Sequence, residues 1–554
     1  MLNRSLLAVA AALALCTCAT TAHAWVWTST DGVTYDAPLS ARTSKHASVN
    51  WINGQYVAVG MMTMTSSDGI NWKQRLDQSN FGTIATHTVA GIAGRYSSGV
   101  ANSAIYTSTD SIRWAYQSSL PPMGAGPARV ASNGSNFLAV VPNTLATALI
   151  YRSSDGLTWN AADSAIPPVY AAAGNTYRVR YLNGRYIIVY QDNYLQWSAD
   201  GGTSFSAINP VGSYSSSDLL TDLAYDNSTG LYLASVTRVG TPSQALLFKS
   251  TDLQTWTPTT VPASITAIQS MTGNGNGFTI AVTPTGSTGT SFDVYRSPDG
   301  ASWTKAATVP ATFARDMLFV NGTTFIATDE PVGNPAYAGP YQSVTTTVTG
   351  PSGAGSVYPP TQTIYSGATA YIAAVPASGY ALTSVTASGC TATRVGNEIQ
   401  LSAFTSPSGS CSVTVRFGVP CNLDVDGDGQ VLAQTDGVMI LRRMLGLTDI
   451  ALTNAAYNPA GTRTGDTLTG RTDIRNYIDT LLTNNLTDID GNSANAAATD
   501  GVLLLRALSG YGGTAATTAA LGTSPVPTRS AWSAIYDYLS GTCGLTNLAP
   551  RATP

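Results

Sequence analysis

The chain has 554 residues, of which 44% are hydrophobic and 10% charged, and its formal net charge is −4. At about 150 residues per domain, this length predicts three or four domains. The acidic balance argues against a nucleic-acid-binding protein, which normally carries a basic face. With 52 glycines and 28 prolines, the composition indicates a turn-rich, mainly β protein.

The acidic residues are almost all aspartates. Only Glu330 and Glu398 among the 31 acidic residues are glutamates. Aspartate is typical of turns, helix caps and calcium loops, whereas glutamate favours helix surfaces. The bias therefore predicts many structural carboxylates.

The first 24 residues have the pattern of a signal peptide. Arg4 precedes an apolar run over residues 6–15, and Ala22-His23-Ala24 forms a cleavage site. The run is too short to span a membrane as a helix, and no later segment is apolar enough to do so. We expect a protein that is secreted or held at the cell surface. The alternative is a lipoprotein anchored through Cys16 or Cys18, although Leu15 and Thr17 fit a lipidation site poorly.

Four cysteines remain in the mature chain, namely Cys390, Cys411, Cys421 and Cys543. An exported protein meets an oxidising compartment, so we expect two disulfides. Four cysteines allow three pairings.

A pattern of the form S-x-D-G-x-x-W recurs seven times in the first 300 residues, at spacings of 37 to 52 residues. Its aspartates are Asp31, Asp68, Asp110, Asp155, Asp200, Asp252 and Asp299. Repeats near 45 residues are typical of four-stranded propeller blades.

A second pattern, in most copies an Asn-Gly turn before an apolar β run, alternates with the first, as at Asn53, Asn183 and Asn321. Asn-Gly between such runs is a strong hairpin signal. Each unit is thus two hairpins, and we predict a seven-bladed β-propeller over residues 25–340. It closes if the hairpin near residues 313–328 pairs with the hairpin near residues 25–37, which removes exposed edges.

The S-x-D-G-x-x-W units resemble Asp-box (BNR) repeats, which occur in sialidases and bacterial exported propellers. The resemblance implies that the Ser hydroxyl and the Asp carboxylate bind backbone N–H groups within the turn. An aromatic residue then packs between sheets. These aromatics are Tyr35, Trp72, Trp114, Trp159, Phe205, Trp256 and Trp303. In the enzymes of this class the boxes lie away from the catalytic face, so we assign them a structural role.

Catalytic residues remain unassigned. A sialidase would need a Tyr–Glu pair, and the propeller contains only Glu330, at its exit. Two histidines, His46 and His87, offer little for Ser–His or zinc chemistry. A glycoside hydrolase with two aspartates stays open as the alternative. Ten aspartates lie outside the boxes, most beside turn residues: Asp36, Asp77, Asp163, Asp192, Asp218, Asp222, Asp226, Asp293, Asp316 and Asp329.

Residues 341–418 consist of short β runs split by Gly, Pro and Ser. The G-S-V-Y-P-P start, the A-V-P-A-S-G-Y core and the closing C-S-V-T-V-R-F strand resemble bacterial InlB-type β repeats. The resemblance implies a small spacer or adhesion domain. Cys390 and Cys411 fall on adjacent elements of it and would staple its core.

Residues 419–554 hold a duplication at an offset of 64. The first copy places Asp424, Asp426 and Asp428 at alternate positions, as in loops that direct oxygens at one Ca²⁺, with the Gln430 carbonyl and Asp436 completing the site. The second copy offers Asp488, Asp490, Asn492 and Asp500. Helices are predicted near residues 435–446, 471–483, 499–509 and 529–540.

This pair of loops resembles type I dockerins, which implies one or two bound Ca²⁺ ions. Two features depart from that family, because the closing Asp falls at loop position 13 and the copies lie unusually far apart. The resemblance alone therefore does not imply cohesin binding. The alternative is an Asp-rich turn that caps a helix without metal. Cys421 and Cys543 bracket the pair and could tie its ends together, so this organisation favours the pairs Cys390–Cys411 and Cys421–Cys543.

The sequence thus predicts a mainly β protein with a propeller, a small β domain and a helical, dockerin-like module. Our leading hypothesis is a secreted, non-catalytic recognition or adhesion protein. Its propeller face would bind a glycan or protein ligand, and its calcium-stabilised tail would dock to a partner. A structural part in a surface assembly is a further alternative.

Overall fold

The computed structural model describes residues 26–37, 46–60, 63–76, 88–92, 94–99, 104–120, 128–142, 148–162, 177–190, 194–208, 218–238, 243–262, 265–287, 289–328 and 340–551. The predicted signal peptide lies outside these residues. The chain divides into two compact units, and the strands of residues 341–418 are shared between them.

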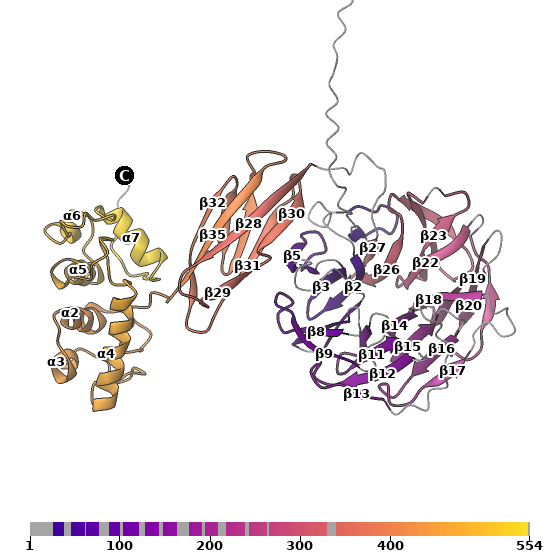
Figure 1. Ribbon diagram of the computed structural model, residues 1–554, viewed down its shortest axis with the longest axis horizontal. Helices are drawn as coiled ribbons and strands as arrows, with labels where there is room; N and C mark the ends of the chain where they lie inside the picture. Colours follow the sequence, from indigo (N-terminus) through magenta and orange to yellow (C-terminus); the bar gives the residue numbers. More distant parts are fainter. Residues whose placement is uncertain are drawn as a thin grey trace, which may run out of the picture. The chain divides into compact units, whose positions relative to one another are not determined.

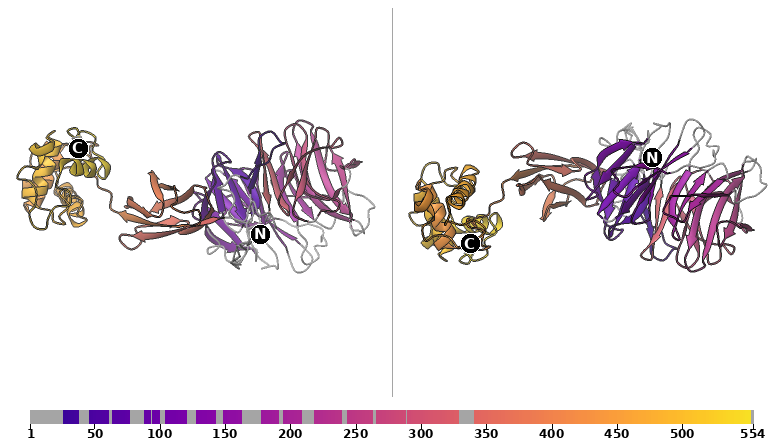
Figure 2. Two further views of the ribbon diagram at one scale, coloured as in Figure 1. Left: turned by 90° about the horizontal axis from the view of Figure 1, so that it is seen from above. Right: turned by 90° about the horizontal axis from the view of Figure 1, so that it is seen from below.

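The N-terminal part is a β-propeller of seven antiparallel sheets arranged around one axis (Figure 1). Figure 2, which views the propeller from its rim, shows the blades standing side by side. The mainly β fold class is thereby confirmed. Alternating turn signals and apolar β runs produce this arrangement, because each pair of hairpins supplies one sheet.

Six blades have four strands each, and the first strand of each blade is the innermost. They are β2–β5 (His46–Ile52, Gln55–Gly60, Thr63–Ser66, Lys73–Leu76), β6–β9 (Thr88–Ile92, Arg95–Gly99, Ala104–Ser108, Ala115–Ser119) and β10–β13 (Arg129–Ser132, Phe137–Pro142, Ala148–Ser153, Asn160–Ala161). The next three are β14–β17 (Tyr177–Leu182, Arg185–Tyr190, Tyr194–Ser198, Ser206–Ile208), β18–β21 (Asp218–Asp226, Leu231–Arg238, Gln244–Ser250, Thr257–Thr259) and β22–β25 (Ile265–Gly273, Phe278–Pro284, Phe292–Ser297, Thr304–Val309).

The seventh blade joins both ends of the propeller chain. Strand β1 (Val26–Ser29) pairs with β27 (Thr323–Thr328), which pairs with β26 (Ala314–Val320). A bridge between Thr28 and Asp36 adds a short outer segment. The predicted pairing of the last Asn-Gly hairpin with the first S-x-D hairpin is therefore confirmed, and the ring is closed.

Tyrosines that follow the turns of the second sequence pattern connect neighbouring blades. The Tyr186 hydroxyl donates to the carbonyl oxygen of Asn136 at 2.6 Å, one blade earlier. The Tyr232 hydroxyl accepts from the Asn183 amide at 3.0 Å. Each contact gives a buried tyrosine hydroxyl in an apolar cluster the hydrogen-bond partner that it needs.

The aromatics of the repeated turns pack between sheets, as the sequence predicts. Trp72 is 1% exposed and contacts a cluster with Tyr56 and Phe325, which come from two different sheets. Phe205, in the longer fifth repeat, packs against the cluster that contains Tyr186. Burial of large aromatic rings is the main apolar contribution at such interfaces.

Residues 341–418 form two four-stranded sheets, with orders β30-β28-β35-β32 and β29-β31-β34-β33. The strands are β28 (Tyr341–Thr349), β29 (Gly355–Tyr358), β30 (Thr361–Tyr365), β31 (Ala370–Pro376), β32 (Ala381–Ser388), β33 (Thr391–Val395), β34 (Glu398–Ser402) and β35 (Ser410–Gly418). Residues of β35 alternate between buried and exposed, which is the pattern of a half-buried strand. A disulfide joins Cys390 to Cys411.

The C-terminal residues form a helical module in two similar halves. The first holds a π-helical turn (Ala433–Gly437), α2 (Val438–Met444), α3 (Asp449–Thr453) and α4 (Leu468–Thr483). The second holds a π-helical turn (Ala497–Gly501), α5 (Val502–Leu508), α6 (Gly513–Thr517) and α7 (Trp532–Gly541). Figure 1 shows each half as its own group of helices. One apolar core, with Ile440, Ile474, Leu504 and Ile535, serves both.

The second disulfide joins Cys421 to Cys543 across this module. Both observed pairs are therefore the ones that the domain organisation favoured. Within the part of the chain that the structure describes, no helix is long and apolar enough to cross a membrane.

Candidate functional site

Each of the seven S-x-D sequences forms the same hydrogen-bonded turn, which we call the S-x-D turn. In the first, one oxygen of Asp31 accepts from the backbone N–H groups of Val33 at 2.8 Å and Thr34 at 2.7 Å. The Ser29 hydroxyl donates to Asp31 and accepts from Gly32. Asp68, Asp110, Asp155, Asp200, Asp252 and Asp299 bind their own turns in the same way. These seven carboxylates therefore serve to hold their own turns together through hydrogen bonds.

The residue after the aspartate has left-handed backbone geometry in these turns. It is glycine in five of them, such as Gly156 with φ of 72°, because glycine adopts this region without strain. Ser111 and Leu253 occupy the position with φ of 60° and 68°. Leu253 is fully buried in the core between two blades, so its side chain contributes apolar packing at this position.

A cavity of about 470 Å³ lies on the axis of the propeller. Its wall takes residues from the inner strand of all seven blades, so it is the central channel. The charged residues in the wall are Arg129, Arg178, Arg180, Arg315 and Asp316. Apolar residues such as Leu220 and Phe313 also line the wall.

Two aspartates lie close together here, and one guanidinium separates them. Nη2 of Arg180 is 3.1 Å from an oxygen of Asp222 and 3.1 Å from an oxygen of Asp316. Arg178 approaches the same two carboxylates at 3.4 and 3.7 Å. Burial lowers the pKa of Arg180, but these two carboxylates outweigh the effect and raise it.

Both carboxylates also bind the inner strand of the following blade. Asp222 is fully buried and accepts from the Ser270 hydroxyl at 3.0 Å and the Met271 N–H at 2.9 Å. Asp316 accepts from the Ser48 hydroxyl at 2.9 Å. Asp222 and Asp316 therefore each link their own blade to the following one.

Most of the ten remaining propeller aspartates were expected to be turn residues. Asp226 is one, because its carboxylate accepts from the N–H groups of Ser228 and Thr229 in the turn that follows its strand. The expectation is wrong for Asp218, Asp222, Asp293 and Asp316, which lie in strands. Their carboxylates are tolerated there because they are paired, as Asp218 is with Arg238 at 3.2 Å and Asp293 is with Lys305 at 2.8 Å. Asp77, Asp163, Asp192, Asp329, Glu330 and His87 lie outside the described residues.

The C-terminal module contains two buried acidic groups that could hold a metal ion. Asp424, Asp426 and Asp436 each place a carboxylate oxygen within 4.8 Å of the others. Asp488, Asp490 and Asp500 do the same in the second half. Carboxylate oxygens are the ligands that hard divalent cations prefer.

Each loop is shaped by N–H groups that point at these carboxylates. In the first loop, the N–H groups of Gly427 and Gly429 donate to Asp424 at 2.7 and 2.9 Å. In the second, Gly491 and Ser493 donate to Asp488 at 2.8 Å each. A side chain at Gly427 would place its Cβ 2.0 Å from the hydroxyl of Thr462, so only glycine fits that position.

The closing aspartates lie within the π-helical turns. The Gly437 N–H donates to the Leu432 carbonyl, five residues earlier, at 3.1 Å, and the Gly501 N–H does so to Ala496 at 3.2 Å. One extra residue in each loop is accommodated in this way, as π-turns commonly do at functional sites. The turns bring Asp436 and Asp500 back to the loops, where they accept from Val425 and Ile489 at 2.6 and 2.7 Å.

Three other ligands were expected: Asp428, which is not part of the first acidic group, and the neutral oxygens of Gln430 and Asn492. Asp428 accepts from the Gln430 N–H at 2.8 Å and from the Asn458 amide at 2.7 Å. Gln430 itself is exposed. Asn492 is 5% exposed, and its side-chain oxygen accepts from the Ala494 N–H at 2.9 Å.

Crowding of negative charge affects the inner carboxylates. Burial raises the pKa of Asp426, the Asn458 N–H lowers it, and Asp436 and Asp428 raise it further. Burial likewise raises the pKa of Asp490, with Asp500 and Asp488 adding to the effect. A cation would remove this cost, because it favours the ionised form of each ligand.

Sequence reasoning missed two arginines that hold these loops. Arg463 donates to the carbonyls of Asp424 and Val425, and Arg529 donates to those of Asp488 and Ile489. The signal was present in the sequence, where Thr462-Arg463-Thr464 and Thr528-Arg529-Ser530 stand 66 residues apart, close to the offset of 64 between the two loops.

No protein-family model matches this chain. No curated protein matches it either. Among solved structures, YCF48 from Cyanidioschyzon merolae is 16% identical over 51% of this chain and 94% of its own, with a TM-score of 0.40. A GH74 enzyme from Niastella koreensis is 14% identical over 51% of each chain, with a TM-score of 0.39. Virginiamycin B lyase from Staphylococcus aureus is 10% identical over 55% of this chain and 98% of its own, with a TM-score of 0.37.

Proposed function

We propose that this is an exported, non-catalytic recognition protein. Its propeller binds a glycan or protein ligand, and its C-terminal module binds Ca²⁺ and docks to a partner. The observation that carries the non-catalytic part is the pairing of Asp222 and Asp316 with one guanidinium, that of Arg180. Carboxylates engaged in this way are poor proton donors and poor nucleophiles, because each already binds a cation and N–H or O–H donors.

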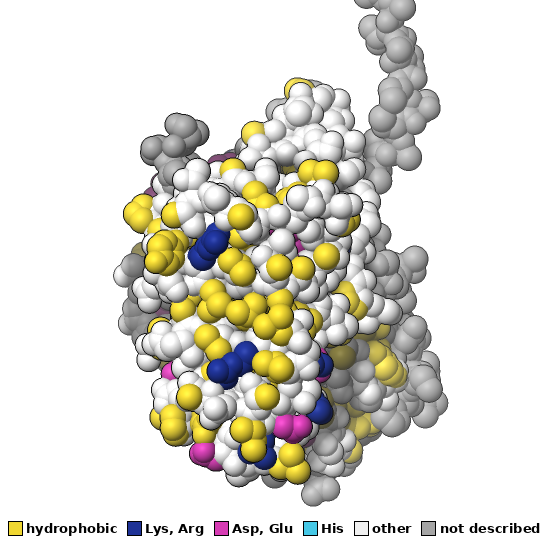
Figure 3. Space-filling view, turned by 90° about the vertical axis from the view of Figure 1, so that its left-hand side faces the viewer, with side chains coloured by type: hydrophobic (Ala, Val, Ile, Leu, Met, Phe, Trp, Pro, Cys, Tyr) yellow, Lys and Arg dark blue, Asp and Glu magenta, His cyan; other side chains and the backbone are white. Residues whose placement is uncertain are grey.

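The resemblance of the S-x-D turns to Asp-box repeats supports the recognition role, since it implies a scaffold that presents loops. Two disulfides support export, because disulfides persist in oxidising compartments. Exposed apolar side chains on the helical module, among them Leu445, Ile450 and Tyr511, support docking. Figure 3 shows apolar side chains scattered over this face, among several Lys or Arg and some Asp or Glu side chains.

A glycoside hydrolase is the second candidate. It is favoured by the short separation of Asp222 and Asp316, since two nearby carboxylates suffice for such chemistry. A glycan array followed by hydrolysis assays on the bound glycans separates the two. Binding without turnover supports the recognition role, and turnover that disappears in Asp316→Asn contradicts it.

Calcium is the metal that we propose for the C-terminal loops. Their ligands are all oxygens, the aspartates alternate along the loop, and a closing carboxylate follows each loop, as Ca²⁺ sites require. The test is thermal unfolding of the full chain with Ca²⁺ or with a chelator. Loss of the stabilising shift in chelator is expected, and identical melting curves would contradict the proposal.

A further inference from the structure

One arginine binds each of the two candidate metal loops, which begin at Asp424 and Asp488. In each half of the module, this arginine lies in the segment before the last helix. Arg463 donates from Nε to the Val425 carbonyl at 2.5 Å and from Nη2 to the Asp424 carbonyl at 2.7 Å. Arg529 donates from Nε to the Ile489 carbonyl at 2.8 Å and from Nη2 to the Asp488 carbonyl. A guanidinium suits this task because its N–H groups form a rigid fork.

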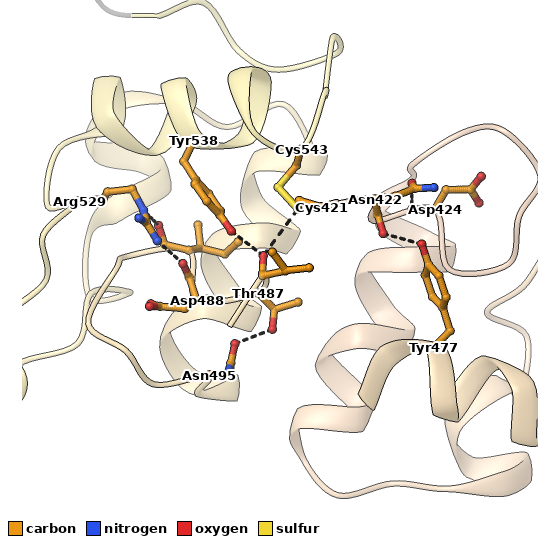
Figure 4. The surroundings of a disulfide bond; sticks show 12 residues. Cys421, Asn422, Asp424, Tyr477, Thr487, Asp488, Asn495, Arg529, Tyr538 and Cys543 are labelled. Atoms are coloured by element: carbon orange, nitrogen blue, oxygen red, sulfur yellow. Dashed lines mark hydrogen bonds between the residues drawn. A yellow bond between two sulfur atoms is a disulfide. The ribbon is translucent and has the colours of Figure 1, made fainter. Parts of the chain in front are cut away.

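A tyrosine holds each guanidinium in place. The Arg463 guanidinium lies 4.0 Å from the ring centre of Tyr477, and that of Arg529 lies 4.1 Å from the ring centre of Tyr538. Each tyrosine hydroxyl donates at 2.9 Å to a carbonyl two residues before its loop, that of Asn422 or that of Leu486. Figure 4 shows Arg529 and Tyr538 beside Asp488, and Tyr477 reaching Asn422.

The backbone N–H of each arginine adds a third hydrogen bond to its loop. The N–H of Arg463 donates to the Asp426 carbonyl at 2.8 Å, and the N–H of Arg529 donates to the Asp490 carbonyl at 2.8 Å. Three successive carbonyls of each loop are thus turned towards the arginine. The two aspartates among these three residues are left to present their carboxylates to the metal.

Electrostatic attraction does not explain why a positively charged arginine lies beside a candidate metal-binding loop. A guanidinium repels a divalent ion nearby, so its neutral replacement would strengthen metal binding if charge were its main effect. A geometric role predicts the opposite, because the loop would lose the contacts that fix the direction of its carboxylates.

We propose that Arg463 and Arg529 are positioning residues that set the metal affinity of the first and second loop, respectively. Each arginine acts on its own loop, since its guanidinium donates to the carbonyls of that loop and stacks on the tyrosine of the same half. This inference rests on the metal binding proposed above.

The test is a Ca²⁺ titration by calorimetry on the full chain, with each loop isolated by removing the closing ligand of the other. In the Asp500→Asn background, Arg463→Gln and Arg463→Lys are expected to weaken Ca²⁺ binding by about 10-fold or more. In the Asp436→Asn background, Arg529→Gln and Arg529→Lys should do the same. Each arginine variant is expected to leave the Ca²⁺ affinity of the other loop unchanged. A general loss of packing would weaken Ca²⁺ binding at both loops.

Arg442→Lys is the matched control. Nη1 of Arg442 also bridges two carbonyls, those of Leu452 and Asn454 at 3.2 and 2.8 Å, but these lie away from the metal loops. The Ca²⁺ affinity of the Arg442→Lys variant should match that of the parent chain. Unchanged or increased affinity in Arg463→Gln would overturn the inference. If the parent chain itself binds no Ca²⁺, the proposed function fails first.

Discussion

Gly437 and Leu505, one from each half of the helical module, are in contact. A Cβ on Gly437 would lie 2.9 Å from Cδ2 of Leu505, and the matching Cβ on Gly501 would lie 2.6 Å from Cδ1 of Leu441. Each glycine directly follows the closing aspartate of its loop. The two candidate metal loops therefore meet through a reciprocal, glycine-dependent helix contact.

Alanine at either glycine should destabilise the module. Gly437→Ala and Gly501→Ala each add a methyl group to a packed contact, and we expect each to lower the free energy of unfolding by about 1–3 kcal/mol. Urea unfolding followed by circular dichroism measures the loss. Gly541→Ala is the control, because no atom lies within 4 Å of its added Cβ. Equal stability of all three variants would contradict the close contact.

Removing the disulfide between Cys421 and Cys543 should lower the free energy of unfolding more than either glycine substitution does. The bond closes a chain segment with a sequence separation of 122 residues, and the chain-entropy model gives about 4–5 kcal/mol for such a loop. We expect Cys421→Ser/Cys543→Ser to shift the denaturant midpoint of the helical module. Cys390→Ser/Cys411→Ser should leave that transition in place, since it affects the β domain. An unaltered midpoint in the first variant would contradict the expectation.

The channel ion pairs should be essential to the propeller. Replacing the fully buried Asp222 by alanine leaves Arg180 without one of its two carboxylates, and breaking such a buried pair costs about 3–5 kcal/mol. We expect a large drop in the melting temperature for Asp222→Ala. Arg113→Ala, which removes an exposed pair with Asp110, should change stability by less than about 1 kcal/mol. Similar effects of the two variants would argue against a cross-linking role.

The S-x-D turns predict an acid-sensitive propeller. Partial burial alone would raise the pKa of Asp68, but hydrogen bonds from Asn71, Ile70 and Ser66 outweigh it and hold the pKa at about 2. The N–H groups of Ser302 and Ala301 lower the pKa of Asp299. A lowered pKa in the folded state contributes stability that is present above about pH 4 and is lost as the pH falls towards 2.

Melting temperatures measured between pH 5 and pH 2 test this. We expect a steep decline for the parent chain and a shallower one for Asp68→Asn, whose turn no longer titrates. A parent chain whose stability is constant over this range would contradict the assignment of these carboxylates to the turns.

Local signals predicted much of this fold. Asn-Gly and S-x-D sequences define tight turns by their own chemistry, so the blades and even the closing pair β1–β27 follow from their order. Loop periodicity likewise placed Asp424 and Asp426 together. Contacts between distant segments were not predictable in this way. Asp316 pairs with Arg180, 136 residues away, and only the closed ring brings them together.

The loop details show the same limit. The shifted positions of Asp436 and Asp500 were visible in the sequence, but the π-helical turns that absorb the extra residue were not. Each turn contacts the first helix of the other half, α5 or α2, which is distant in sequence. Arg463 lies 39 residues from Asp424, and its role follows only from the folded half.

The most direct test of the account is a calorimetric Ca²⁺ titration of the metal-stripped full chain. Two bound ions per chain are predicted, with Asp436→Asn losing one and Asp500→Asn the other, because each removes the closing ligand of one group. Asp479→Asn, which alters only a pair with Arg443 away from both groups, should retain two. A chain that takes up no Ca²⁺, or closing-ligand variants that still bind two ions, would contradict it.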